Sequence, residues 1–177
     1  MVSAKHTLVA LVQDKPGVLN KMVSLFRRRG FNIASIAVGS SESAGFSRIT
    51  FVVNGTLTTV EQVRKQLLAK VVEVVKVTDI SDEDIVIREL ALIKVKAPAG
   101  SRSEIIQIVD IFRSDIVDVS QDSLTIEITG TEDKIESLLD LLRQFGIKEL
   151  TRTGRIAMTR GSSVAGEERV AADSAES

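Results

Sequence analysis

Hydrophobic and polar residues follow a repeating order along the first eighty positions. Strand-like apolar runs alternate with two stretches in which apolar residues recur three and four positions apart, the spacing of one helix face. The polar stretch SSESAG, residues 40–45, separates two of the strand-like runs as the turn of a hairpin. The predicted order is βαββαβ, with strands at 6–12, 32–39, 47–53 and 71–80 and helices at 18–30 and 58–68.

The second half of the chain repeats this order. Thr131 suits the N-cap of its second helix, and Gly146 suits the position just after that helix. The elements are predicted as strands at 85–96, 116–119, 124–129 and 147–158 and helices at 103–113 and 131–145. The apolar stripes of the helices predict core residues at Leu19, Met22, Val23, Phe26, Val60, Val63, Leu67, Ile135, Leu138, Leu139, Leu141 and Leu142.

Two consecutive βαββαβ series predict an α+β protein made of two ferredoxin-like domains. We place the first domain at 4–80, a linker at 81–84, the second domain at 85–160 and a disordered tail at 161–177, where small and polar residues show no periodicity. The two helices cover one face of each sheet, whereas the other face and the edge strands still need cover. Pairing with a second copy through an edge strand would supply it, so we expect a homodimer.

Composition excludes several classes of protein. The 177 residues include no cysteine, which removes disulfides, thiolate metal ligands and thiol nucleophiles. A net charge of −1, with 3% aromatic residues and neither Trp nor Tyr, argues against nucleic-acid binding. Apolar runs fall short of the roughly 20 residues of a membrane span, and the first residues resemble a strand rather than a secretory signal. We therefore expect a cytoplasmic protein that binds neither membrane nor nucleic acid.

The sequence lacks the residue spacings typical of catalytic centres. His6, the single histidine, lies within a predicted strand, and no zinc motif, Walker loop, G-x-S-x-G or G-x-G-x-x-G occurs. The acids at 82–84 fit a solvated hinge, and Glu132 and Asp133 fit the first turn of a helix, where acids complement the helix dipole. We expect no catalytic site, metal or cofactor in this chain.

Three arginines, Arg27, Arg28 and Arg29, end the first predicted helix. They could contact a phosphate or an acidic partner. They could also complement the negative end of the helix dipole, which is worth roughly 0.3–1 kcal/mol for each cation. Both interpretations stay open.

The stretch DKPGVL, residues 14–19, could bind a carboxylate. Proline favours a helix entrance, and Gly17 allows the backbone to approach a ligand closely. The N–H groups of Gly17, Val18 and Leu19 would then point out of the helix start, where anions bind well. An ordinary helix start without a ligand is the alternative for this stretch taken alone.

Topology predicts a partner for this helix start in a second chain. In a βαββαβ unit the first strand ends and the second strand begins at opposite ends of the sheet, so Asn32 lies far from Gly17 within one chain. Antiparallel pairing of two chains through the second strand would bring Asn32 of one copy to Gly17 of the other. A small zwitterion would fit there, with its carboxylate on the helix start, its ammonium on strand carbonyls or Asp14, and its side chain against Val18 and Ile33.

The motifs DKPGVL, LFRRRGFNI and SRIT, in this order between residues 14 and 50, resemble the ACT domain of acetolactate synthase (acetohydroxyacid synthase) small regulatory subunits. Residues 102–161, RSEIIQ through AMTRG, resemble the C-terminal domain of the same family. The resemblance covers about residues 4–161 and leaves the tail outside.

This resemblance implies a regulatory subunit without an active site of its own. Such subunits bind a larger catalytic subunit that holds thiamine diphosphate, Mg²⁺ and FAD, raise its activity and confer feedback inhibition by valine, with leucine and isoleucine as further candidate effectors. The larger subunit condenses two pyruvates to acetolactate, or pyruvate with 2-oxobutyrate, in branched-chain amino-acid biosynthesis. The family's effector site falls here on Asp14, Gly17, Val18, Asn20, Asn32 and Ile33.

A stand-alone ACT-domain sensor of amino acids, regulating transcription or another enzyme, is the alternative, because one fold serves many functions. A DNA-binding version should carry a helix-turn-helix and a basic face, and the sequence shows neither. Contact with a large subunit is expected through the second domain. Candidate residues there are Arg102, Arg113, Arg152 and Arg155, none of which the sequence singles out.

Overall fold

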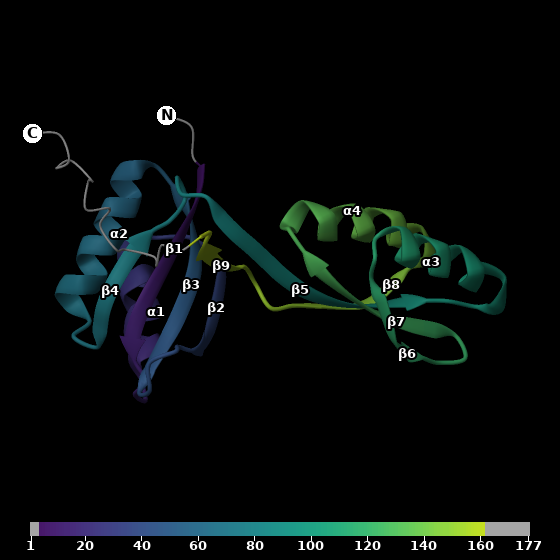
Figure 1. The fold of residues 1–177 in the computed structure, drawn as a ribbon, viewed down its shortest axis with the longest axis horizontal. Coiled ribbons are helices and arrows are strands. Elements are labelled where there is room, and N and C mark those ends of the chain that lie inside the picture. The colour runs from purple at the N-terminus through teal and green to yellow at the C-terminus, as the bar shows by residue number, and fades with distance from the viewer. Residues whose placement is uncertain (1–3, 162–177) are drawn as a thin grey trace, which may run out of the picture. The chain divides into compact units, whose positions relative to one another are not determined.

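The computed structural model of the chain describes residues 4–161 and contains two antiparallel sheets, each with two helices on one face (Figure 1). The predicted tail, apart from Gly161, lies outside the described residues. Within the described part, no helix has the length and apolar character that crossing a membrane requires.

The first six elements form one ferredoxin-like unit. In chain order they are β1 (Ala4–Gln13), α1 (Val18–Arg29), β2 (Ile33–Ser40), β3 (Phe46–Gly55), α2 (Leu57–Lys70) and β4 (Val74–Asp79). The strand order is β2-β3-β1-β4, and β1 pairs antiparallel with both β3 and β4. The predicted fold class is confirmed, and β2 and β4 are the two edges of this sheet.

The next elements repeat the topology. They are β5 (Ile85–Lys96), α3 (Ala99–Ile111), β6 (Asp115–Val119), β7 (Ser123–Gly130), α4 (Glu132–Leu142), a 3-10 turn at Arg143–Phe145, β8 (Ile147–Arg152) and β9 (Ile156–Thr159). The main strand order is β6-β7-β5-β8, with β9 also paired to β5. The single strand predicted at 147–158 is wrong, because Gly154 adopts a left-handed φ of 82° and divides it into β8 and β9.

The chain separates into two compact units whose limits differ slightly from the predicted domains. The first contains residues 4–34, 38–86 and 157–161, and the second contains residues 35–37 and 87–156. The end of the described chain belongs to the first unit because it returns there: the Arg160 N–H donates to the Asp84 carbonyl at 2.8 Å.

The sheet of the first unit packs its inner face on α1 and α2. Helix α1 buries Val18, Met22, Leu25 and Phe26. The prediction that Leu19 and Val23 belong to the core is wrong, since they are 42% and 46% exposed. Apolar residues occupy a wider arc of α1 than its own sheet covers, and Leu19 and Val23 lie on the uncovered part of that arc.

The opposite face of this sheet is partly covered by the chain itself. Val9 and Val52 lie on that face and are buried. Arg48, four residues before Val52 and on the same face, donates from Nη2 to the Ala157 carbonyl at 3.4 Å. We expected another protein surface to cover this face; at Arg48 the segment around Ala157 also contacts it.

The core of the second unit lies between its sheet and α3 and α4. Ile93, Ile126 and Ile128 fill the sheet side, and Ile105, Val109, Ile135, Leu138, Leu139 and Leu142 fill the helix side. Thr131 caps α4 as predicted, because its Oγ1 accepts from the Lys134 N–H at 3.4 Å. Leu141, also predicted to be buried, is 45% exposed.

Two leucines on α4 test this packing with matched chemistry. Leu139 is 2% exposed and Leu141 is 45% exposed. We expect Leu139→Ala to lower the free energy of unfolding by about 2–5 kcal/mol, through lost burial and a residual cavity, and Leu141→Ala to lower it by about 0.5 kcal/mol or slightly more. Guanidinium denaturation followed by circular dichroism measures both, and equal losses would contradict the assigned orientation of α4.

Candidate functional site

The start of α1 is a glycine-capped turn. Gly17 occupies the N-cap with φ 85° and ψ −8°, in the left-handed region that residues with a Cβ adopt at a cost. A Cβ placed there would meet no atom within 4 Å. Backbone conformation, rather than crowding inside this chain, is therefore what requires glycine.

Two backbone hydrogen bonds hold the turn against neighbouring loops. The Asp14 N–H donates to the Gly45 carbonyl at 2.8 Å, and the Gln13 N–H donates to the Glu73 carbonyl at 2.9 Å. One of the N–H groups predicted to bind a carboxylate has an acceptor within the chain, since the Val18 N–H donates to the Lys15 carbonyl at 3.4 Å. That bond is long, and the N–H groups of the following first-turn residues have no intrahelical acceptor, as at every helix start.

Sequence reasoning missed a carboxylate close to this turn. Glu73 forms an ion pair with Lys21, whose own N–H donates to the Gly17 carbonyl at 3.0 Å. The hydrogen bond from Lys21 holds the pKa of Glu73 below its usual range, so the carboxylate is ionised at neutral pH. A single acid within the valine run VVEVV was the available signal.

The remaining candidate residues lie at the other end of the sheet. The Asn32 carbonyl accepts from the Asn54 N–H at 3.4 Å, next to the end of β3, where Gly55 pairs with Ala4. Gly17 instead follows the far end of β1, where Gln13 pairs with Phe46. Helix α1, with 12 residues, spans about 18 Å between the two ends.

The six predicted effector residues therefore form two separate groups in one chain. Asp14, Gly17, Val18 and Asn20 lie at the β1–α1 turn, and Asn32 and Ile33 lie at the α1–β2 turn. Asp14, Gly17, Asn20 and Asn32 are exposed, Ile33 is half-buried and the Val18 side chain is buried. One copy does not bring the two groups together.

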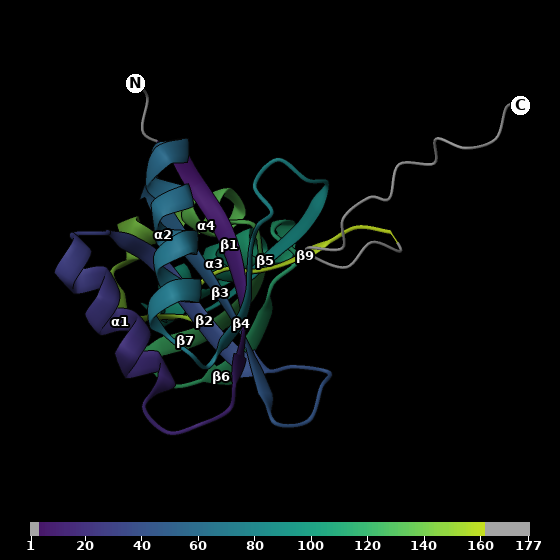
Figure 2. The same ribbon diagram turned by 90° about the vertical axis from the view of Figure 1, so that its left-hand side faces the viewer.

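An apolar surface adjoins the β2 edge of the same unit. Helix α1 lies toward the β2 side of the sheet and α2 toward the β4 side (Figure 2). The exposed side chains of Leu19 and Val23 on α1, together with Val38 on β2, give this side an apolar character. We call these three residues and the unpaired edge of β2 the β2 surface.

Most arginines considered for partner contact are engaged within the second unit. Arg102 Nη2 donates to the carbonyls of Ala97, Ser120 and Gln121 at 3.0, 2.7 and 2.9 Å. Its role is to hold the start of α3 against the β6–β7 turn. Arg113 adopts a left-handed φ of 51° just after α3.

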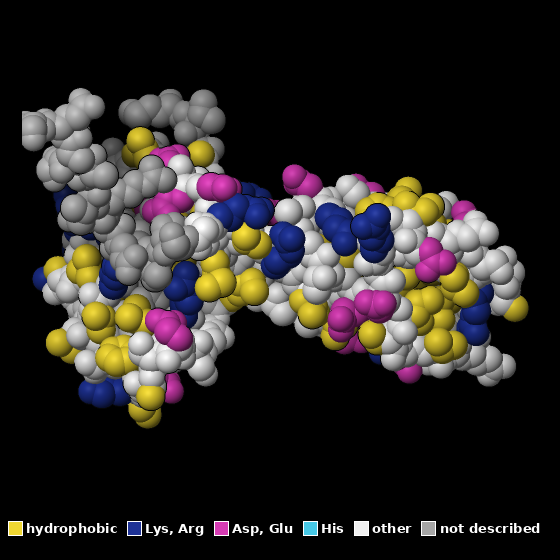
Figure 3. Space-filling view, viewed as in Figure 1, with side chains coloured by type: hydrophobic (Ala, Val, Ile, Leu, Met, Phe, Trp, Pro, Cys, Tyr) yellow, Lys and Arg dark blue, Asp and Glu magenta, His cyan; other side chains and the backbone are white. Residues whose placement is uncertain are grey.

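Arg152 and Arg155 are held by acids of the same unit. Arg152 binds Glu89 through two bonds of 2.9 and 2.7 Å and also contacts Glu136. The hydrogen bonds that Arg152 donates to Glu89 raise the pKa of its guanidinium, which stays charged. Arg155 pairs with Glu132 at 3.0 Å. Cations and anions also intermix on the face drawn in Figure 3, without a large area of one sign.

His6 has polar neighbours that its position in sequence did not reveal. Its Nδ1 lies 3.5 Å from Asp79 Oδ2, and Ser81 Oγ donates to the other oxygen of Asp79. Ser81 Oγ also accepts from the Thr7 N–H at 2.8 Å. The serine bonds the aspartate rather than the histidine, so the group anchors the turn after β4 and does not form a nucleophile–base pair. In the described residues, no three His, Cys, Asp or Glu side chains are grouped to hold a metal ion.

Two substitutions test the backbone conformation of Gly17. We expect Gly17→Ala to lower the free energy of unfolding by about 1 kcal/mol, because alanine pays for the left-handed conformation. Gly17→Asn should cost less, since asparagine tolerates this region. Denaturation curves of both variants give the comparison, and an alanine variant as stable as the asparagine variant would contradict the conformation assigned to Gly17.

Comparison with known proteins agrees with this arrangement of domains. Residues 8–76 match a family model described as "AHAS small subunit-like ACT domain", and residues 88–161 match "Small subunit of acetolactate synthase". A probable acetolactate synthase small subunit of Archaeoglobus fulgidus is 55% identical over 158 residues, which cover 89% of this chain and 98% of that protein. The acetolactate synthase small subunit of Mycobacterium bovis is 51% identical over 156 residues, covering 88% and 92%.

A solved structure extends the similarity to three dimensions. The crystal structure of the acetolactate synthase small subunit from Thermotoga maritima superposes with a TM-score of 0.84 at 48% identity, and the match covers 90% of this chain and 99% of that one. The similarity spans both ferredoxin-like units. The chain belongs to the family of acetolactate synthase small subunits.

Proposed function

We propose that this chain is a regulatory subunit that activates the catalytic large subunit of acetolactate synthase and makes it sensitive to feedback inhibition by valine, or by leucine or isoleucine. Family membership supports the role. The proposal of an effector site is supported by the position of the candidate residues, whose two groups lie at opposite ends of one sheet. A second copy of the chain could place its own second group next to the first group of this copy.

The β2 surface supplies a way to bring the two groups together. Antiparallel pairing of β2 with the β2 of a second copy would extend the sheet across the dimer and reverse the direction of the partner. The start of β2 in one copy then approaches the β1–α1 turn of the other. Leu19 and Val23, which the chain's own core leaves exposed, would become buried along the same interface.

The completed site would suit a small zwitterion. The first turn of α1 offers N–H groups and the positive end of the helix dipole to a carboxylate. Asp14 and nearby strand carbonyls are available to an ammonium group, and the Asn32 side chain adds an amide from the second copy. Because the Val18 side chain is buried, Ile33 is the better contact for an aliphatic effector side chain.

Effector binding across an interface provides the regulatory coupling. A ligand changes an equilibrium only by binding one state better than another. An amino acid held by both copies stabilises the arrangement in which they meet, and coupling energies of about 1–3 kcal/mol correspond to roughly 5- to 150-fold changes.

The large subunit would supply the chemistry. In this proposal thiamine diphosphate, Mg²⁺ and FAD bind to the large subunit, which condenses two pyruvates, and this chain acts through contact. Arg102, Arg152 and Arg155 are poor contact candidates because their donors are engaged within the second unit. The match of residues 88–161 to a small-subunit model favours this role over a stand-alone ACT sensor.

Asn32→Ala tests the effector site. For the unmodified chain, valine at about 100 times its Kd should add roughly 2.7 kcal/mol to the free energy of unfolding if it binds only the folded form. Asn32→Ala should weaken valine binding in calorimetry by about tenfold, the equivalent of one lost hydrogen bond at the upper end of the usual range.

The same variant separates sensing from activation. Mixed with the large subunit, Asn32→Ala should still raise acetolactate formation while valine inhibition weakens. Gln107→Ala removes an exposed amide on α3 and serves as the control. Unchanged valine affinity in Asn32→Ala would overturn the site, and an unmodified chain that binds none of the three amino acids would overturn the effector assignment.

Val23→Glu tests the dimer. A carboxylate on the exposed part of α1 would be buried next to the partner's α1, so we expect the dimer to dissociate at concentrations where the unmodified chain remains paired. Light scattering after size exclusion measures the mass. Val72→Glu is the control, because Val72 is 85% exposed and lies after α2, away from the β2 surface. Equal masses for both variants at every concentration would contradict dimerisation through this surface.

A further inference from the structure

The middle of β2 contacts the turn between β8 and β9. The Arg155 N–H donates to Ser35 Oγ at 2.9 Å. Gly154 adopts a left-handed φ of 82°, and a Cβ on it would lie 2.8 Å from Ser35 Oγ and 3.1 Å from the Ile36 carbonyl oxygen. A glycine at this position is therefore what allows the two segments to approach so closely. Residues 35–37 belong to the second unit, as do Gly154 and Arg155, whereas both ends of β2 belong to the first.

The same turn is bound to two other elements of the second unit. The Thr153 N–H donates to the Leu90 carbonyl of β5 at 3.0 Å, and Thr153 Oγ1 accepts from the Leu90 N–H at 3.1 Å. The Arg155 guanidinium pairs with Glu132, the first residue of α4, at 3.0 Å, and the Arg155 side chain is only 18% exposed. A displacement of Ser35 therefore acts on a turn that is tied to an inner strand and to a helix.

Ser35 closely follows the second group of candidate effector residues, Asn32 and Ile33. β2 begins at Ile33, and side chains two positions apart in a strand share a face and lie about 7 Å from each other along the strand. A ligand that fixes Ile33 therefore also restricts the position of Ser35, because the extended backbone between them is short and stiff.

Few points of the chain connect one unit to the other. Within residues 4–161 the chain passes between the two units four times, after residues 34, 37, 86 and 156. The first of these points separates Ile33 from Ser35, and the last comes one residue after Arg155. The bond between Ser35 and Arg155 thus joins the passage next to a candidate effector residue to the passage by which the chain leaves the second unit.

We propose that Ser35, Gly154 and Arg155 are positioning residues that transmit effector binding from β2 to the second unit, an inference that rests on the proposed effector site. An amino acid bound at the start of β2 holds Ser35 where it accepts from the Arg155 N–H, and the turn then keeps the Arg155 guanidinium on α4. The two states are this contact formed and this contact broken. The effector favours the first because a ligand shifts an equilibrium toward the state that it binds better.

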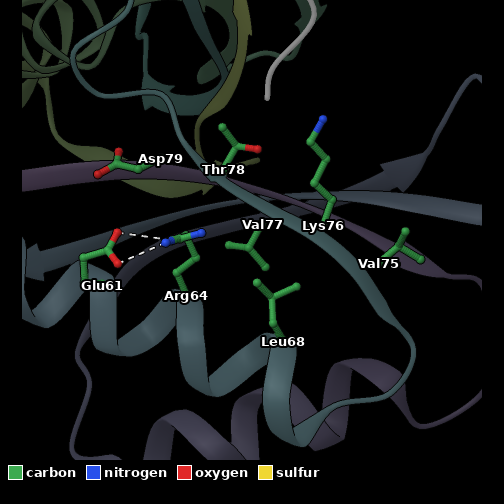
Figure 4. Close-up of a pocket in the computed structure, with 8 residues that line it drawn as sticks. All are labelled: Glu61, Arg64, Leu68, Val75, Lys76, Val77, Thr78 and Asp79. Carbon is green, nitrogen blue, oxygen red and sulfur yellow. Dashed lines mark hydrogen bonds and ion pairs between the residues drawn. The ribbon is translucent and has the colours of Figure 1, made fainter. Parts of the chain in front are cut away.

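The opposite edge of the first sheet supplies an internal control. There β4 borders a pocket of about 430 Å³ between itself and α2, whose charged lining is balanced, with Glu61 and Asp79 against Arg64 and Lys76 (Figure 4). These residues belong to the first unit and take no part in the contact of Ser35 with Arg155. Amides of residues 76–79 therefore report changes in the stability of the first unit that do not pass through Ser35.

Hydrogen exchange measured by mass spectrometry tests the proposal on the full chain. The effector is whichever of valine, leucine and isoleucine binds the unmodified chain in calorimetry. At saturation it should slow exchange of residues 134–138 in α4 by roughly 3- to 10-fold, the equivalent of one hydrogen bond, and Ser35→Ala should abolish this slowing. Exchange of residues 76–79 should be the same in both chains. Ser35→Ala should still bind the effector, weakened by no more than the same factor, because coupling is reciprocal.

Mixtures with the large subunit give a second measurement. Ser35→Ala should still activate acetolactate formation and lose most of the inhibition by the effector. Gly154→Ala should do the same, because its Cβ would displace Ser35 Oγ. Ser40→Ala removes an exposed hydroxyl from the far end of β2 and is the matched control.

The outcomes separate this proposal from the effector site. If Ser35→Ala binds the effector and shows the same inhibition and slowed exchange as Ser40→Ala, the transmission through Ser35 is overturned and the effector site stands. A loss of effector affinity far beyond tenfold in Ser35→Ala would make Ser35 part of the binding site and would also overturn the transmission. An unmodified chain that binds none of the three amino acids would overturn the effector site itself.

Discussion

The length of α1 is the constraint on which the candidate site depends. Its 12 residues place the β1–α1 turn and the α1–β2 turn at opposite ends of the sheet, about 18 Å apart. A hydrogen-bonded helix packed on a sheet cannot shorten, so no local adjustment within one copy brings Asn32 to Gly17. If these residues share a ligand, the ligand must join two copies, and sensing is then inseparable from assembly.

The two units begin their first helices differently, although both have glycine close to a proline. In the first unit Gly17 is the N-cap and no side chain occupies the cap position. In the second unit Pro98 is the N-cap, and Arg102 fills the adjoining space by binding carbonyls on both sides. A helix start can receive an anion only where its own side chains leave room, which favours the first unit as the sensing unit and the second as a scaffold.

The edges of the first sheet pose two separate physical problems. An unpaired strand edge invites association, and a protein must either use that tendency or block it. The β2 edge adjoins the exposed apolar residues Leu19 and Val23, a combination suited to a copy of the same chain. The β4 edge adjoins α2, where Glu61 and Arg64 form an ion pair and the acids and cations are balanced. The two edges of one sheet therefore differ in the side chains that lie beside them.

The sequence by itself determined the order of elements, the fold class and the positions of most core residues, because hydrophobic periodicity depends on local backbone geometry. It also indicated the turn at Asp14–Gly17. Only the tertiary structure decided which part of the apolar arc of α1 is buried. Leu19 and Val23 are as apolar as Val18 and Leu25, but the sheet covers only Val18 and Leu25. The ion pair of Glu73 with Lys21 and the hydrogen bonds of Arg102 join residues that are distant in sequence, and hydrophobic periodicity does not report such contacts. The division at Gly154 depends on one backbone angle, which hydrophobic periodicity does not report either.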